Sequence, residues 1–206
     1  MSEHYFSNKP QSKSEPKTWK FHLRGFSLSF TSDHGVFSKG EVDFGSRTMI
    51  EAFSESEVEG DILDLGCGYG PIGITLAKAF PNRKIVLSDI NERAISLARQ
   101  NAFQNNTSNV EFHVSDRFES FSNRRFASIL INPPIRAGKK VIFQMFEESY
   151  QALIPHGELW IVIQKKQGAP SAKKKLEEMF SEVEVVEKNK GYFVFCAKKT
   201  NSSTVS

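Results

Sequence analysis

From residue 61 onward, the chain alternates between short apolar runs and longer amphipathic stretches. Five runs of apolar and β-branched residues predict buried strands, at 61–65, 84–88, 110–114, 126–131 and 158–163. Between them, apolar residues recur at helical spacing and predict helices at 71–80, 95–103, 141–154 and 171–180. Strands that alternate with helices predict an α/β fold with a doubly wound, mostly parallel sheet and right-handed crossovers.

Two hairpins flank this alternating core in the sequence. Residues 18–23 and 26–30 alternate apolar and polar positions on either side of Arg24 and Gly25, which predicts an N-terminal β-hairpin extension. At the other end, 183–186 and 192–197 predict a C-terminal antiparallel hairpin. A short helix is expected between the first hairpin and the first buried strand, with Ser46 as its N-cap.

The same pattern sets the domain boundaries. Residues 1–16 are polar and contain two prolines, so we expect a loose leader. Residues 17–198 form the one predicted domain, and the polar residues 199–206 form a disordered tail. A chain of 206 residues is long enough for one α/β domain with a full core.

Composition excludes only a few classes of function. The net charge is +3, which is mild and does not by itself imply a nucleic-acid partner. Basic residues do gather within 136–175, where they could recruit phosphates. Cys67 and Cys196 lack metal-ligand spacing, so we expect no metal site and a reducing, cytoplasmic setting. No apolar run could span a bilayer, so no membrane association is expected; the oligomeric state stays open.

A glycine-rich turn joins the first predicted strand to the first helix. It reads Asp-Leu-Gly-Cys-Gly-Tyr-Gly-Pro at 64–71, and Gly66, Gly68 and Gly70 allow the backbone to approach a ligand closely. Read from Gly68, the spacing fits a dinucleotide fingerprint, with Asp89 about 20 residues further on. Read from Asp64, it resembles the first motif of class I S-adenosylmethionine methyltransferases. We favour this second register because a carboxylate at the strand end suits a cationic cofactor tail and would repel a pyrophosphate.

Polar residues end the first four predicted strands: Asp64, Asp89, Asp116 and Asn132. Ligands of such sheets bind at the carboxyl ends of the strands. We expect Asp64 to balance the ammonium or sulfonium of S-adenosylmethionine. Asp89 is expected to accept both ribose hydroxyls, and Asp116 to accept from the adenine amine. Asn91 is either a further adenosine contact or the cap of the next helix.

A double proline follows the fourth strand, directly after Asn132. Pro133 and Pro134 stiffen the chain and remove backbone donors, so the Asn132 amide oxygen and the Pro133 carbonyl remain as acceptors for a planar NH2 group. The stretch resembles the (Asp/Asn)-Pro-Pro-aromatic motif of amino-group N-methyltransferases. Ile135 replaces the aromatic residue and can press on a base without stacking, and Phe37 is a candidate to cover the other side.

Three stretches together resemble the ribosomal RNA small-subunit methyltransferase C family, whose members methylate guanine at N2. They are 35–38 with 43–47, then 64–70, and then 132–134 with 138–139. The resemblance extends over 18–198 and agrees best with a stand-alone, single-domain bacterial branch that carries Ile-Arg-Ala-Gly-Lys after the two prolines. It implies a Rossmann-like class I methyltransferase fold.

The resemblance also implies an activity. The enzyme would transfer a methyl group from S-adenosylmethionine to an exocyclic amine, with guanine N2 of ribosomal RNA as the expected target and Asn132, Pro133 and Pro134 as catalytic residues. Two alternatives stay open. One is N5-methylation of a protein glutamine, against which Ile135 and the basic segment after it argue. The other is an RNA-binding domain of the same fold without catalysis.

RNA is the partner that this reading implies. Arg136, Lys139 and Lys140 follow the double proline directly, so they are expected beside the substrate entrance. There they would contact RNA phosphates next to the target base, while Ile135 and Phe37 would contact the base itself.

Overall fold

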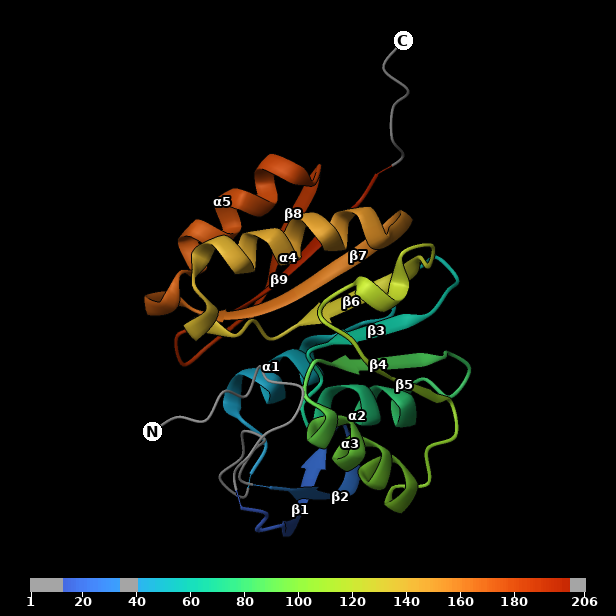
Figure 1. Cartoon of the computed structure of the whole chain (residues 1–206). Coiled ribbons are helices and arrows are strands. Elements are labelled where there is room, and N and C mark those ends of the chain that lie inside the picture. The colour runs from blue at the N-terminus through green and yellow to red at the C-terminus, as the bar shows by residue number, and fades with distance from the viewer. Residues whose placement is uncertain (1–12, 34–40, 201–206) are drawn as a thin grey trace.

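A seven-stranded sheet forms the centre of the computed structural model (Figure 1). In spatial order its strands are β5 (Val110–Val114), β4 (Ile85–Asp89), β3 (Ile62–Leu65), β6 (Phe126–Ile131), β7 (Leu153–Gln164), β9 (Tyr192–Lys198) and β8 (Glu182–Asn189). The first five strands are parallel, and β9 pairs antiparallel with both β7 and β8. The prediction of a doubly wound, mostly parallel sheet with a C-terminal antiparallel hairpin is confirmed.

The structure describes residues 13–33 and 41–200. Phe37 and the rest of the 35–38 stretch lie outside these residues, so the predicted contact of Phe37 with the target base remains a prediction.

Helices cover both faces of the sheet. One face carries α1 (Phe44–Ala52), α2 (Pro71–Ala79) and α3 (Glu92–Gln104), and the other carries α4 (Lys139–Ala152) and α5 (Ala169–Met179), as Figure 1 shows. Short 3-10 turns occur at η1 (Glu119–Phe121), η2 (Ile135–Ala137) and η3 (Lys165–Gln167). Because side chains alternate along a strand, Ile62 packs into one core cluster while Leu63 and Leu65 pack into the other.

The N-terminal hairpin, β1 (Lys17–Leu23) with β2 (Phe26–Ser32), forms a separate two-stranded sheet, as predicted. It packs against α3 through Asn101, which is fully buried. The Asn101 amide accepts from Thr31 N–H (2.7 Å) and donates to the carbonyls of Thr31 (2.9 Å) and Tyr69 (2.8 Å). Tyr69 belongs to the glycine turn, so the hairpin is attached to that turn as well as to the helix.

Two predicted boundaries were wrong. Helix α1 begins at Phe44, and its N-cap is Asp43 rather than Ser46, because the Asp43 carboxylate accepts from Ser46 N–H at 3.0 Å. Strand β7 begins at Leu153, within the stretch expected to be helical, because Leu153 already pairs with Phe126 before a register shift. At the end of the described chain, Lys199 still pairs with the backbone of His156 and Gly157. Over the described ranges, no helix has the length and apolarity that a bilayer crossing requires.

Candidate functional site

The order of the strands brings three of the predicted site residues together. Strands β4 and β5 lie on one side of β3, and β6 and β7 lie on the other, so the strand order reverses between β3 and β6. In sheets of this kind the ligand crevice lies at that point, outside the carboxyl ends of the strands. Asp89, Asp64 and Asn132 stand at or beside the carboxyl ends of the neighbouring strands β4, β3 and β6.

The glycine turn is anchored to the end of β4. Gly66 N–H and Cys67 N–H both donate to the Ser88 carbonyl at 2.8 Å. Gly66 is exposed, has a φ of +74°, and a side chain there would meet nothing within 4 Å. That open space fits a backbone that a ligand approaches. Gly70 differs, because an added Cβ would lie 2.7 Å from the Cδ1 atom of Ile74; this glycine serves packing within the core.

Asp64 is almost completely buried under this turn, with 2% of its surface exposed. One carboxylate oxygen accepts from Gly73 N–H, 2.9 Å away near the start of α2. Burial raises the pKa of the Asp64 carboxyl to about 7, the Gly73 hydrogen bond opposes this increase, and the charge of Asp89 adds to it. Asp64 forms no ion pair within the described residues, so a cation placed nearby would stabilise its ionised form.

Asp89, at the end of β4, is also buried. One of its oxygens accepts from Gly68 N–H and the other from Asn91 N–H, each at 2.9 Å. An ionised carboxylate accepts hydrogen bonds, as ribose hydroxyls require, and the contact of Asp89 with the ribose stays a prediction. The structure adds a second role, because Asp89 holds the glycine turn in shape.

The two other predicted adenosine contacts differ in exposure. Asn91 is fully buried and caps α3, its amide oxygen accepting from Ala94 N–H at 3.1 Å. The cap interpretation of Asn91 is therefore confirmed, and its cofactor contact remains a prediction. Asp116 lies beyond β5, with 42% of its side chain exposed and an ion pair to Arg117 at 3.4 Å. Its carboxylate is accessible to a ligand at this edge of the sheet.

Asn132 is exposed at the end of β6, and its amide is held by the start of α1. The NH2 group donates to the Asp43 carboxylate at 3.2 Å and to the Ser46 hydroxyl at 3.0 Å. Both amide donors are thereby used. The amide oxygen forms no hydrogen bond with any described residue, so it remains an acceptor for a ligand.

Sequence reasoning missed Asp43 and Ser46 as partners of Asn132. They lie 89 and 86 positions away in the chain, and only the fold brings them to the end of β6. A signal was present, because the Asp-Phe-Gly-Ser stretch at 43–46 was among the motifs that marked the family resemblance.

The short segment that follows Asn132 is buried at its start and exposed at its end. Pro133 is buried, whereas Pro134 and Ile135 are partly buried, and Ile135 packs against the core beside α4. Only part of Ile135 can therefore face a substrate.

The three cations predicted to meet RNA are Arg136, Lys139 and Lys140, and all three are exposed. Arg136 lies in η2, and the two lysines begin α4. The structure thus places all three at the same edge of the sheet as Asn132. Among the described residues there is no group of three or more side chains able to bind a metal ion.

Known proteins share both the sequence pattern and the fold. The family model of the methyltransferase small domain matches residues 27–196. The Bacillus subtilis protein YbxB, itself described as uncharacterized, is 60% identical over 200 residues, which cover 97% of this chain and 100% of that protein. The ribosomal RNA large subunit methyltransferase G of Klebsiella pneumoniae is 29% identical over 160 residues, which cover 74% of this chain and 42% of that enzyme.

A solved structure matches the fold with a TM-score of 0.79 and 25% identity. It is the T. thermophilus 16S rRNA N2 G1207 methyltransferase (RsmC) in complex with AdoMet and guanosine, and the match covers 91% of this chain and 51% of that one. The chain therefore spans about half the length, or less, of the two ribosomal RNA methyltransferases that it resembles, but the full length of YbxB.

Proposed function

The chain belongs to the methyltransferase small domain family, and from this premise we propose that it methylates the N2 amine of a guanine in ribosomal RNA. The chain has the fold and family of an S-adenosylmethionine-dependent methyltransferase, and S-adenosylmethionine is its cofactor. The choice of amine and of RNA is the part that we propose.

The residues at the strand ends suit this cofactor. S-adenosylmethionine supplies an activated methyl group on a cationic sulfonium and also carries an ammonium. Burial disfavours the ionised form of Asp64, repulsion from the charge of Asp89 adds to this, and both effects raise the pKa of Asp64. A cationic ligand relieves this repulsion, whereas a pyrophosphate would add to it. The exposed Gly66, with open space where a side chain would be, leaves room for the ligand.

The anchored amide of Asn132 is the observation that carries the proposal. Asp43 and Ser46 bind its NH2 group, so its oxygen is presented as an acceptor and cannot easily exchange places with the nitrogen. An acceptor in that place suits a target that donates, such as an exocyclic amine. The Pro133 carbonyl, on a backbone stiffened by two prolines, is proposed as the second acceptor.

These acceptors act in two ways. They position the amine nitrogen for attack, and alignment of this kind can contribute several kcal/mol to the rate. They also stabilise the positive charge that develops on the nitrogen as it gains the methyl group. The nitrogen then releases one proton to water, so no strong general base is required.

Guanine in ribosomal RNA is favoured over other amines by two relatives. The solved RsmC structure is named for N2 methylation of 16S rRNA, and the Klebsiella enzyme for methylation of the large-subunit RNA. An exposed cluster of cations directly after the double proline is consistent with an RNA substrate. A base within an RNA helix must be unstacked to reach such a site.

Methyl transfer to ribosomal RNA tests the proposal directly. Ribosomes and free ribosomal RNA from a strain that lacks this protein are incubated with the enzyme and methyl-labelled S-adenosylmethionine. We expect label in RNA, at guanine N2 after digestion to nucleosides, and transfer that is slower by roughly a hundredfold or more with the Asn132→Ala variant. RNA from the parent strain should accept far less label, because its target is already methylated.

Other outcomes would identify the alternatives. Label in protein, on the side-chain amide of a glutamine, would replace the RNA target with a protein one. Calorimetry that detects no binding of S-adenosylmethionine would contradict catalysis altogether and favour a silent RNA-binding domain.

A further inference from the structure

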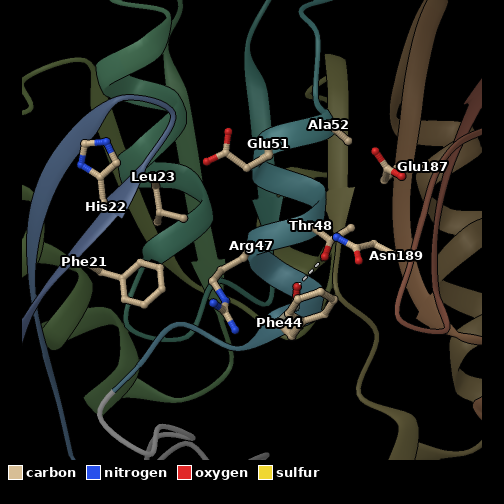
Figure 2. A pocket seen from close by; sticks show the side chains of 10 residues that line it. All are labelled: Phe21, His22, Leu23, Phe44, Arg47, Thr48, Glu51, Ala52, Glu187 and Asn189. Carbon is tan, nitrogen blue, oxygen red and sulfur yellow. Dashed lines mark hydrogen bonds between the residues drawn. The ribbon is translucent and has the colours of Figure 1, made fainter.

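A pocket of about 390 Å³ opens beside α1 (Figure 2). Its walls come from β1, α1 and β8, three segments that are distant in the sequence. Pockets of a few hundred Å³ are large enough to hold a small ligand or part of a larger one. The residue that sets its chemistry is Arg47, whose guanidinium lies between the rings of Phe21 and Phe44, as Figure 2 shows.

Arg47 is partly buried, and its guanidinium has no hydrogen-bond acceptor among residues 13–33 and 41–200. The guanidinium carbon lies 5.3 Å from the centroid of the Phe21 ring and 5.2 Å from that of Phe44. The Nε atom is buried without a hydrogen-bond partner, and the guanidinium forms no ion pair within the described residues. The two rings hold the cation but cannot satisfy five N–H donors. Unpaired donors of this kind are costly, and a bound anion would satisfy them.

The carboxylates that line the same pocket are engaged elsewhere. Glu51 accepts from Arg24 N–H at 2.7 Å, and Glu187 accepts from Lys188 N–H at 2.9 Å. Neither carboxylate forms an ion pair with Arg47, so the guanidinium keeps its charge available to a ligand.

The pocket lies next to the proposed catalytic residues. Arg47 N–H donates to the Asp43 carbonyl at 3.0 Å, which puts Arg47 one helical turn, about 5.4 Å, along α1 from Asp43. The Asp43 side chain in turn holds Asn132. An anion bound by Arg47 would therefore lie close to the amine that receives the methyl group.

A second cation and a third ring extend this surface. Lys190 lies with its Nζ atom 5.1 Å from the centroid of Phe44, and the ring of Tyr192 lies 5.6 Å from the same centroid. Proteins commonly bind single-stranded nucleic acid through cationic side chains combined with aromatic rings. This combination favours a nucleotide over an isolated carboxylate as the ligand.

We propose that Arg47 binds a backbone phosphate of the RNA strand beside the target nucleotide, with Lys190 as a second contact. The proposal rests on the proposed function, because it assumes an RNA substrate. The site differs from the one expected at Arg136, Lys139 and Lys140, which belongs to the segment after the double proline. The RNA would then be held on two sides of Asn132.

Arg47→Gln tests the proposal, and Arg125→Gln is the matched control. Arg125 is exposed and directly precedes β6, whereas Asn132 directly follows it, so the control removes the same charge at the opposite edge of the sheet. Binding is measured by fluorescence anisotropy with a short, labelled single-stranded RNA that contains one guanine, over a series of salt concentrations. S-adenosylmethionine affinity and melting temperature are measured on the same proteins.

We expect Arg47→Gln to weaken RNA binding by roughly tenfold at low salt, the scale for one hydrogen-bonded charge contact. The slope of log K against log salt should decrease by about 0.7, the amount for one phosphate on a single strand. Arg47→Lys should keep most of the slope because it keeps the charge. Arg125→Gln should change neither quantity, and all variants should keep wild-type cofactor affinity.

Three results would overturn the proposal. Unchanged RNA affinity and slope in Arg47→Gln, while the wild type binds RNA, would reject this site alone. A loss of cofactor affinity in Arg47→Gln would assign the guanidinium to the carboxylate of S-adenosylmethionine. If the wild type binds S-adenosylmethionine but no RNA, this site and the RNA target of the proposed function both fail.

Discussion

At the scale of single residues, Asn132 is proposed to act through an amide whose two ends have different tasks. Its NH2 group is bound by Asp43 and Ser46, and its oxygen is proposed to accept from the substrate amine. We expect Asn132→Ala to reduce the single-turnover rate by roughly a hundredfold or more, the scale for losing one preorganised electrostatic partner. Cofactor affinity should hold within a few-fold, because the predicted cofactor contacts lie on other residues.

The partner Asp43 makes a sharper version of this experiment possible. Asn132→Asp keeps an acceptor but faces the Asp43 carboxylate across the present 3.2 Å contact, and two like charges at that distance repel. Asp43→Asn in the same protein restores a donor and still allows a helix cap. We therefore expect the double variant to be faster than Asn132→Asp alone. A stable Asn132→Ala protein with a near-normal rate would remove Asn132 from the mechanism.

Asp64 predicts a pH dependence of folding and of cofactor binding. Its pKa of about 7 in the folded state lies above the unfolded value of 3.8, so between these values the folded state binds more protons. Stability should therefore fall as pH rises from about 4 to about 7, by at most roughly 4 kcal/mol. Above that window the carboxylate is ionised and favours a cation, so affinity for S-adenosylmethionine should rise as pH increases through about 7.

Asp64→Asn is the variant that checks this behaviour. An amide does not titrate, so the slope of stability should flatten between about pH 4 and about pH 7, as denaturation measures, and the slope of cofactor affinity should flatten around pH 7, as calorimetry measures. If the variant keeps the wild-type slope of stability against pH, the titrating group is a different one.

At the scale of elements, the N-terminal hairpin supports the glycine turn. Asn101 joins Thr31 of β2 to Tyr69 of the turn, and the Tyr69 ring packs edge-on against Trp19 and Phe30 of the hairpin. Since Tyr69 lies between Gly68 and Gly70, the position of the hairpin affects the shape of the turn.

Replacing Asn101 should therefore affect both stability and ligand binding. Asn101→Ala removes three buried hydrogen bonds to backbone groups, so we expect the free energy of unfolding to fall by about 2–4 kcal/mol. Gln104→Ala is the control, because Gln104 lies on the same helix and donates to Ser29 of β2 from a partly buried position. The Gln104→Ala substitution should lower the free energy of unfolding by about 1 kcal/mol or less. Equal losses in the two variants would contradict the role assigned to Asn101.

At the scale of the whole molecule, the proposed RNA contacts gather at one edge of the sheet. The net charge of +3 is small, so attraction to RNA depends on where the cations lie. Replacing Arg136, Lys139 and Lys140 by glutamine should lower the salt slope of RNA binding by about 2, since each lost phosphate contact on a single strand contributes about 0.7. Cofactor affinity should not change.

The control removes the same charge at the opposite edge. Lys78 ends α2, Lys84 precedes β4 and Arg125 precedes β6, so all three lie near the amino ends of the parallel strands. Their replacement by glutamine should leave the slope unaltered. An equal decrease in both triple variants would mean that RNA is attracted by overall charge and not by a site.

Short-range patterns predicted most of the elements. The turn at 64–71 was found because glycines and a strand-end carboxylate lie within a few residues of one another. Asn132 with its two prolines was found in the same way. The bond from Gly68 N–H to the Asp89 carboxylate was not predicted, because Gly68 lies 21 positions away in the chain and only the pairing of β3 with β4 brings the two together. The helix start was misjudged because Asp43 and Ser46 are both good caps, and the backbone geometry selects between them.

The sequence by itself determined the α/β architecture, the glycine turn and the double proline after β6, because each depends on periodicity or on residues close together in the chain. Its resemblance to a methyltransferase family indicated the class of reaction. The tertiary structure decided which residues bind the Asn132 amide and which two aromatic rings contact the Arg47 guanidinium. These contacts join α1 to β6 and α1 to β1, and they form only when sheet order and helix packing bring distant segments together. The tertiary structure also decided the pKa of Asp64, which is raised because the protein packs around the carboxyl.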